Sequence, residues 1–283
     1  MKKKYLFLLI TLLFVRFTVF SQDDLLSQID SKDSNTEVLA AFKAQKIVNL
    51  ESTKLLGKKE LYFVVAHRFG SVKDGFEGFF GLDNAVTQIK FIYGLGSKVS
   101  IGAGRSEQAY DFSIKYLIAP QRENGLPFTF VGFNSVGFNN QMKESNYPRM
   151  EFSDRMMYVN QILISRKFND KLSLELAPSY FHENFVIDDG QDNSQFSLGM
   201  GGRYKISKRV SINMDYAAHL NRSSTSPFRN PLSLGVDIET GGHVFQMHFT
   251  NAQAMHEAGF LANATGDWGK GDIFFGFNLV RVF

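Results

Sequence analysis

Charged and polar side chains that could carry chemistry fall at every second position of several apolar stretches. Where such a stretch forms a β-strand, alternate side chains point to opposite faces, so these groups share one face. In a closed sheet that face lines a narrow interior, where charges of both signs pair with one another. The candidates for this lining are Lys90, Lys115, Glu175, Arg203, Lys205, Asp215, His219, Asp237, Glu239 and His248. Two interpretations stay open, a polar path for a small solute and an ion-pair network that fills a closed interior.

Histidine and cysteine show no metal-binding pattern. His243 and His248 are five residues apart and would face opposite sides of a strand, and neither HxH nor HExxH occurs. Cysteine is absent, which excludes disulfides, thiolate metal sites and a cysteine nucleophile. We predict no metal and no cofactor.

A catalytic role would need a different arrangement. A lipid-facing Ser–His pair at the membrane interface would point to a phospholipase-like hydrolase. Serine lies mostly on the polar face in this sequence, and no such pair is evident. We therefore predict no catalytic residues and a chain that is not an enzyme, and we keep the hydrolase as a remote alternative.

A second group of side chains lies near the outer end of the first predicted strand. His67 and Arg68 precede a loop that contains Asp74 and Asp83. Arginine forms strong, often bidentate hydrogen bonds with carboxylates, so we predict a structural clamp there. The apolar residues of 74–82 have helical spacing, which predicts a short helix that packs on the rim or folds into the mouth.

Period-two alternation dominates the chain from about residue 58 onward. A clear example is Val210, Ile212 and Met214, which enclose Ser211 and Asn213. The pattern recurs and predicts about twelve strands of roughly 9–13 residues, enough to cross a bilayer at a tilt.

Tight turns and long polar loops mostly alternate between these strands. The tight turns lie at 95–97, 168–170, 206–208 and 240–242, and the long loops at about 138–152, 182–194, 220–230 and 251–270. Outer-membrane barrels have this asymmetry, with short periplasmic turns and longer outer loops. We therefore predict an all-β fold, a closed antiparallel up-and-down transmembrane β-barrel. Because the number of strands is even, the first strand begins and the last strand ends on the periplasmic side.

A secreted soluble β-sandwich is the competing architecture. It alternates as well, but its apolar faces pack inward. Aromatic residues near the strand ends indicate interfacial girdles, and charge and glycine on the polar face indicate a wet interior. These features favour the barrel.

The last strand must pair with the first to remove the edges of the sheet. Its apolar face ends in Phe275, Phe277, Leu279 and Phe283. This terminal pattern resembles the C-terminal signal that outer-membrane assembly machinery reads. The resemblance implies two partners, the assembly machinery and the lipid of the outer membrane.

The N-terminus has the layout of a secretory signal peptide at residues 1–21. Lys2, Lys3 and Lys4 precede an apolar run from Tyr5 to Phe20 that contains Arg16. Without these four basic residues the chain keeps 27 basic residues against 28 acidic ones. The basic overall balance therefore gives no support for a nucleic-acid partner.

Residues 22–57 show neither the layout of a signal peptide nor the period-two alternation of the strands. A short helix is predicted after Asn35, and residues 45–53 read as an additional strand or as an inward-folded plug. We assign residues 22–57 to the periplasm or the barrel mouth, and residues 58–283 to the barrel. The sequence does not indicate an oligomeric state.

Several short motifs along the chain point to one family. They are His67-Arg68-Phe69-Gly70, Asp74-Gly75-Phe76, Phe79-Phe80-Gly81-Leu82-Asp83, Gly102-Ala103-Gly104-Arg105, the run from His243 to Asn251, Thr265-Gly266-Asp267-Trp268 and the run from Gly276 to Phe283. With these the chain resembles a Gram-negative outer-membrane β-barrel family of unknown function, of the DUF5777 type. The resemblance implies a barrel and an outer-membrane location, and it supplies no catalytic residues.

Overall fold

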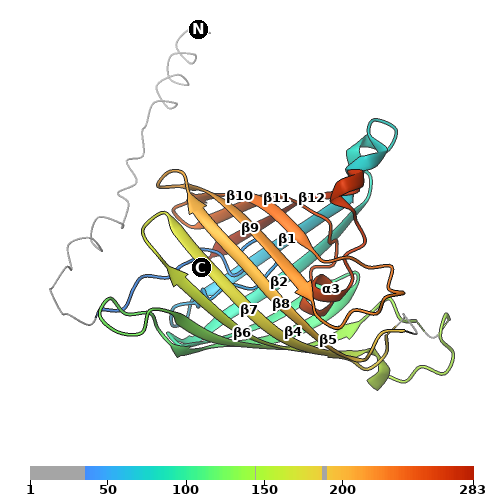
Figure 1. Ribbon diagram of the computed structural model, residues 1–283, viewed down its shortest axis with the longest axis horizontal. Helices are drawn as coiled ribbons and strands as arrows, with labels where there is room; N and C mark the ends of the chain where they lie inside the picture. The colour runs from blue at the N-terminus through green and yellow to red at the C-terminus, as the bar shows by residue number, and fades with distance from the viewer. Residues whose placement is uncertain (1–35, 144, 187–189) are drawn as a thin grey trace, which may run out of the picture. The chain divides into compact units, whose positions relative to one another are not determined.

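The computed structural model describes residues 36–143, 145–186 and 190–283. The predicted signal peptide, residues 1–21, lies outside the described residues. Twelve strands form most of the described chain (Figure 1): β1 Leu61–Ser71, β2 Ala85–Gly96, β3 Val99–Ser106, β4 Ala109–Ala119, β5 Thr129–Asn139, β6 Met156–Lys167, β7 Leu172–Glu183, β8 Ser194–Lys205, β9 Val210–His219, β10 Leu232–Thr240, β11 His243–Thr250 and β12 Phe274–Val282. The connections contain η1 Val72–Asp74, η2 Phe79–Gly81, η3 Ser153–Arg155, α3 Glu257–Ala262 and η4 Trp268–Lys270. In this part of the chain no helix has the length and apolarity that a bilayer crossing requires.

The twelve strands close into a barrel. Each strand pairs antiparallel with its neighbours in the chain, and β12 pairs back with β1. At this seam Arg68 lies opposite Gly276, and beyond it Leu61 and Phe283 exchange backbone hydrogen bonds of 3.1 and 2.9 Å. A closed sheet leaves no unpaired edge, which the hydrocarbon of a bilayer requires. The predicted twelve-stranded up-and-down barrel is confirmed, and the sandwich alternative is excluded.

The two faces of the wall have opposite chemistry. In β9 the side chains of Ile212 and Met214 are exposed, whereas those of Ser211, Asn213 and Asp215 are buried in the interior. Most other strands repeat this division, although β1, β5 and β6 also point apolar side chains inward, among them Ala66, Phe133 and Leu163. An apolar outside and a polar inside are the arrangement of a barrel whose solvent is lipid.

Ile212→Arg is expected to lower the free energy of unfolding by about 2–4 kcal/mol, because the guanidinium would lie among acyl chains. Ile206→Arg is the matched control, since Ile206 is exposed in the turn between β8 and β9. There the same change should cost less than about 0.5 kcal/mol. Urea unfolding in phospholipid vesicles measures both values, and equal costs would contradict the assignment of the outer face.

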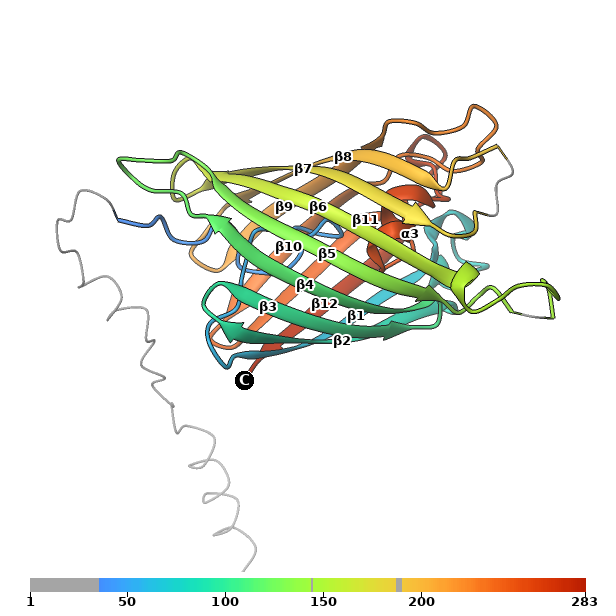
Figure 2. The ribbon, with the colours of Figure 1, turned by 90° about the horizontal axis from the view of Figure 1, so that it is seen from below.

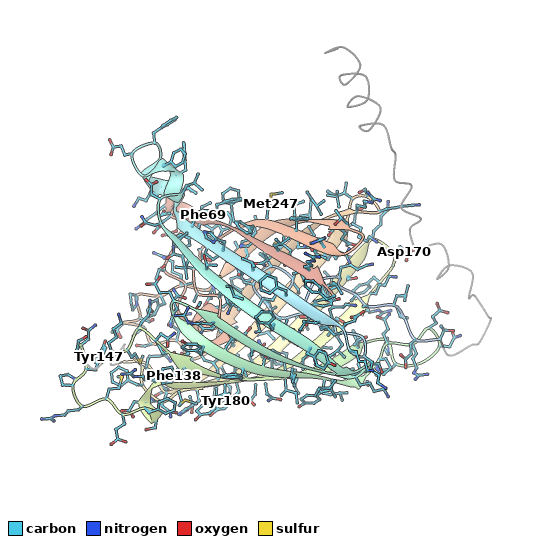
Figure 3. The ribbon with its side chains drawn as sticks, turned by 180° about the vertical axis from the view of Figure 1, so that it is seen from behind. Phe69, Phe138, Tyr147, Asp170, Tyr180 and Met247 are labelled. Atoms are coloured by element: carbon cyan, nitrogen blue, oxygen red, sulfur yellow. The ribbon has the colours of Figure 1, made fainter. Side chains whose placement is uncertain are left out.

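The two ends of the barrel differ in the length of their connections. One end carries the short turns 97–98, 168–171, 206–209 and 241–242, together with a longer connection, 120–128, that was not predicted. β1 begins and β12 ends at this short-turn end. The opposite end carries longer loops, apart from the short connection 107–108. Figure 3 shows the two ends through Asp170, in a short turn, and Tyr147, in a long loop.

Residues 41–56, here called the plug segment, run inside the ring of strands (blue in Figures 1 and 2). Its apolar side chains, including Ile47 and Leu50, are almost completely buried. The predicted helix after Asn35 is absent from the described residues, where Glu37 instead forms a bridge with Arg122. The plug segment itself bends around a bridge between Lys46 and Glu51. Its backbone N–H groups donate to side chains of the wall and to carbonyl oxygens of the same segment.

The long loop between β11 and β12 fills the outer part of the same interior. Its helix α3 is buried along its whole length, with the side chain of His256 accepting the N–H of Gly259 at the N-terminal cap. Phe260 and Leu261 belong to one apolar cluster with Phe133 and Phe181, which point inward from the wall. Chain from both ends of the barrel therefore occupies the lumen.

The loop between β1 and β2 projects from the barrel as a lobe (cyan in Figure 1). It contains two 3-10 turns, η1 and η2, in place of the predicted helix. Phe79 and Phe80 have positive φ values of 45° and 54°, which a right-handed helix does not allow. The side chain of Phe76 is 86% exposed, so this loop neither packs it on the rim nor buries it in the mouth.

Candidate functional site: the occupied lumen

One carboxylate of the wall holds the turn of the plug segment. Oδ2 of Asp215 accepts the backbone N–H groups of Val48, Asn49 and Leu50 at 3.0, 2.7 and 2.8 Å. Three consecutive N–H groups that converge on one oxygen form a cup for an anion. Hydrogen bonds to an ionised acceptor are stronger than neutral ones, and this contact is fully buried. A wall residue therefore fixes the conformation of the plug segment.

The side chain of Asn49 joins the plug segment to three strands. Its amide donates to Oγ of Ser233 at 2.9 Å and to Oγ1 of Thr250 at 3.2 Å. Its carbonyl oxygen accepts from Nη2 of Arg68 at 2.6 Å. The same guanidinium donates to Oδ1 of Asn278 at 2.9 Å. Since Arg68 belongs to β1 and Asn278 to β12, these bonds lie across the seam that closes the barrel.

Arg68 does not form the predicted loop clamp of His67 and Arg68 with Asp74 and Asp83. Consecutive residues of a strand point to opposite faces, so His67 and Arg68 cannot reach one loop together. Arg68 points inward and is buried, whereas His67 points outward and stacks on Phe277 at 5.3 Å between ring centroids. Asp83 is exposed in the loop.

Ion pairs add a second set of links to the plug segment. Nζ of Lys46 lies 2.8 Å from Glu257 of α3 and 3.6 Å from Glu51. Glu51 also lies 2.6 Å from Nζ of Lys115, which points inward from β4. All four side chains are largely buried, so each charge depends on its partner for solvation.

The same network continues into the wall through Lys90. Its Nζ lies 2.8 Å from Asp111 and 3.7 Å from Glu257. Burial alone would raise the pKa of the Glu257 carboxyl, but the ammonium groups of Lys46 and Lys90 hold this pKa well below its usual range. Glu257 is therefore ionised, and it fastens α3 to both the wall and the plug segment.

Glycines of the wall make room for the apolar side chains of the plug segment. A Cβ at Gly199 would lie 2.8 Å from Cδ1 of Leu50, and a Cβ at Gly201 would collide with Ile47. Glycine on a strand often marks a place where another part of the chain approaches closely. These inward glycines therefore seat the plug segment.

Little space remains in the interior. A cavity of about 30 Å³ lies among residues of the plug segment, β1, β2, β11 and β12, and two further spaces measure about 10 Å³ each. A single water needs roughly 10–15 Å³ measured in this way. Each of these three interior spaces thus holds at most a few water molecules.

All ten residues predicted to line the interior lie on the inner face. Lys90, Lys115, Glu175, Arg203, Asp215, His219, Asp237 and His248 are buried, whereas Lys205 and Glu239 are partly buried near the short-turn end. Arg203 forms an ion pair with Glu239. Neither ring nitrogen of His248 has a hydrogen-bond partner among the described residues. A role of these ten residues in passing a solute stays a prediction.

The residues of the polar network in the lumen were only partly foreseeable. Asp111 and Asn278 lie on the polar parity of their strands, and the alternation alone could have added them to the predicted lining. Lys46, Glu51 and Glu257 come from segments without alternation, so the sequence gives no signal for them.

An outward Ser–His contact exists that the sequence did not reveal. Oγ of Ser194 lies 3.0 Å from Nδ1 of His182, and the hydroxyl of Tyr180 lies 3.2 Å from the same oxygen. In a hydrolytic triad the serine bonds to Nε2, while a carboxylate orients Nδ1. In the described chain no carboxylate bonds to His182, and no cluster of metal ligands is present. The contact therefore lacks the arrangement of a nucleophile and its base.

The predicted C-terminal signal residues occupy the last strand and the chain terminus. Phe275, Phe277 and Leu279 lie on the outer face of β12, and Phe283 is exposed beyond it. The guanidinium of Arg281 covers the ring of Phe283 at 4.5 Å. Recognition by the assembly machinery stays a prediction.

Comparison with known families identifies this barrel. Residues 42–283 match the family described as a membrane-bound beta barrel domain, DUF5777. The chain belongs to this family. The match begins at Phe42, so the DUF5777 domain includes nearly all of the plug segment as well as the twelve strands. No curated protein matches the sequence.

Solved structures with a similar architecture include outer-membrane proteins. The NanC porin is 11% identical, with a TM-score of 0.49 over 78% of this chain and 98% of that one. An outer-membrane channel from Pseudomonas putida F1 is 11% identical, with a TM-score of 0.46 over 81% and 97%. The Acinetobacter baumannii outer membrane protein Omp33 is 8% identical, with a TM-score of 0.43 over 80% and 99%. These likenesses concern architecture alone.

Proposed function

We propose that this protein is an outer-membrane channel for a small polar solute, closed at rest by the plug segment and opened when that segment withdraws. The observation that carries the proposal is the contact between the Asp215 carboxylate and three backbone N–H groups of the plug segment. It holds the plug segment through a wall side chain, and none of the twelve strands pairs with the backbone of residues 41–56. Water can replace such bonds, so the segment can leave while the sheet stays intact.

The direction of withdrawal follows from where the plug segment joins the barrel. It continues through residues 57–60 into β1, which begins at the short-turn end. In an exported outer-membrane barrel this end faces the periplasm. The plug segment would therefore leave toward the periplasm, whereas the long loops, with α3 in the outer part of the lumen, lie toward the cell surface.

The chemistry of the inner wall indicates the class of solute. Lysine, arginine, carboxylate and amide side chains point inward from most strands. Once the plug segment has left, these groups offer hydrogen bonds and charges of both signs to whatever enters. A small polar solute fits this lining, whereas an apolar one would gain nothing from it.

A disulfide that locks the plug segment tests the proposal. Oγ1 of Thr53 and Oγ of Ser165 are 2.6 Å apart in the lumen. Two sulfurs in these places can bond at about 2.05 Å after a small shift. The chain has no other cysteine, so Thr53→Cys/Ser165→Cys can form one intramolecular bond. We expect the oxidised variant to show no conductance in planar bilayers, and a reductant to restore the openings of the unmodified protein.

Two controls accompany the disulfide variant. Each single cysteine variant should conduct like the unmodified protein with or without reductant. A variant that lacks residues 41–56, with barrel content checked by circular dichroism, should conduct continuously. A folded barrel that stays closed without these residues would overturn the proposal.

The filled lumen favours one second candidate. Cavities of about 30 Å³ or less describe a closed interior, which suits a barrel that serves as a structural or surface-interaction protein. In that case the oxidised and the reduced forms of Thr53→Cys/Ser165→Cys would show the same conductance in planar bilayers. Deleting part of the outer loops, 140–155 or 251–270, would instead abolish a partner interaction while the barrel stays folded.

A further inference from the structure

The outer wall carries two asparagines where lipid-facing strands are expected to be apolar. Asn134 of β5 and Asn160 of β6 lie directly opposite each other in the sheet register, and both side chains point outward. Nδ2 of Asn134 donates to Oδ1 of Asn160 at 2.5 Å. Figure 2 shows β5 and β6 side by side on one side of the barrel.

Both amides lie within the apolar face. Asn134 is the central residue of β5, with Val136 and Phe138 outward on one side of it and Phe130 on the other. Asn160 lies between Tyr158 and Ile162 on the outer face of β6. A membrane barrel keeps polar side chains at the ends of this face, where head groups and water begin.

The bond between the two amides leaves hydrogen-bonding capacity unused. One N–H of Asn134, its carbonyl oxygen and both N–H groups of Asn160 have no partner among the described residues. Acyl chains offer neither donors nor acceptors, so these groups lose hydrogen bonds wherever lipid covers them. Something polar is therefore needed at this position of the wall.

The wall is hollowed at the same place. A depression of about 450 Å³ is bordered by Tyr116, Tyr180, Phe196 and Ile162, with the two amides in it. The ring of Tyr116 lies over Gly132, where a Cβ would collide with it. The pairing between β6 and β7 also has a gap between Gln161–Ser179 and Ile164–Leu176, beside Pro178, which has no N–H to donate. Figure 3 shows Tyr180 on the outside of this wall.

We propose that this face is the interface between two copies of the chain in the membrane. Copies inserted in the same orientation are related by an axis along the membrane normal, so residues of equal depth meet. An amide both donates and accepts, so the Asn134–Asn160 pair of one copy can satisfy the same pair of a second copy. The aromatic and aliphatic rim around the depression supplies the packing that such contacts need in lipid. The proposal does not depend on whether the barrel conducts.

Cysteine cross-linking tests it, because the chain contains no cysteine of its own. Ile162→Cys places one thiol beside the amides, and Ile89→Cys places one on β2, four strands away; both isoleucines are 46% exposed. With a mild oxidant in vesicles at high lipid-to-protein ratio, we expect a cross-linked dimer from Ile162→Cys and monomer from Ile89→Cys. Adding Asn134→Leu and Asn160→Leu should lower the dimer yield from Ile162→Cys about tenfold, which corresponds to about 1.4 kcal/mol.

Two results would overturn the proposal. One is a dimer yield at Ile162 no higher than that at Ile89. The other is a disulfide, formed in native membranes, between the Ile162 position and a different protein. Because leucine suits a lipid-facing wall, the double leucine variant should fold, and its urea unfolding checks this independently.

Discussion

Asp215→Ala is expected to leave the barrel open for most of a bilayer recording. The change removes the acceptor of three backbone N–H groups of the plug segment, at Val48, Asn49 and Leu50. A hydrogen bond to a charged group contributes about 1.5–3 kcal/mol, and buried N–H groups left unpaired add to the loss. Even a total of about 3 kcal/mol would raise the ratio of open to closed barrels on the order of a hundredfold.

Asp237→Ala is the matched control for this prediction. Asp237 is a buried aspartate on the next strand; it accepts no hydrogen bond from the plug segment itself and is linked to it only through Gln246, whose amide also donates to the carbonyl oxygens of Lys46 and Ile47. It should raise the open fraction far less. An independent measurement is the rate at which a water-soluble maleimide labels Thr53→Cys, which should rise with Asp215→Ala. Equal labelling in both backgrounds would show that Asp215 does not hold the plug segment.

Lys90→Met is expected to cost the barrel about 3–5 kcal/mol of stability, the largest change we expect from a single wall residue. Methionine keeps the length of the side chain but removes its charge. Asp111, which lies 2.8 Å from Nζ of Lys90, would then remain buried without a cation beside it. Glu257 would lose one of its two lysine partners and keep only Lys46. Urea unfolding in vesicles measures the difference.

The same substitution at Lys167 separates charge from burial. Lys167 forms an ion pair of 3.2 Å with Asp170, whose side chain is 98% exposed. Such a surface pair contributes about 0–1 kcal/mol, so Lys167→Met should have little effect. Adding Asp111→Asn to Lys90→Met should recover part of the loss, because it removes the stranded charge. If Lys90→Met and Lys167→Met cost the same, the buried network is not stabilising.

Most of the wall was predictable because most strands obey the same local rule. The alternation around Ile212 follows from the geometry of one extended strand in lipid and needs no knowledge of distant residues. The number of strands and the inward direction of Lys90 or Asp215 follow in the same way. The connection at 120–128 broke the rule of short turns, and the signals for it were local ones, since Pro120, Pro127 and the Asn124-Gly125 pair between them mark a loop.

The occupied lumen could not be predicted, because its contacts join residues far apart in the chain. Asn49 and Asp215 are 166 positions apart, and the plug segment has no periodicity that would indicate its surroundings. For this reason the sequence is compatible with both a filled and an open interior. Arg68 shows the same limit, because its position beside the loop aspartates predicts a clamp with them, whereas its actual partner Asn49 is visible only in the folded barrel.

The position of Asn49 at the seam has a consequence for the order of events during folding. Arg68 in the first strand bonds to Asn49, and Asn278 in the last strand donates to the carbonyl oxygen of the neighbouring Val48 at 3.1 Å. Residues 41–56 are synthesised before any strand, so they are present when the last strand finds the first. The barrel then closes around the plug segment, which already offers hydrogen bonds to both the first and the last strand. The plug segment thereby acts as a template for the pairing of β1 with β12.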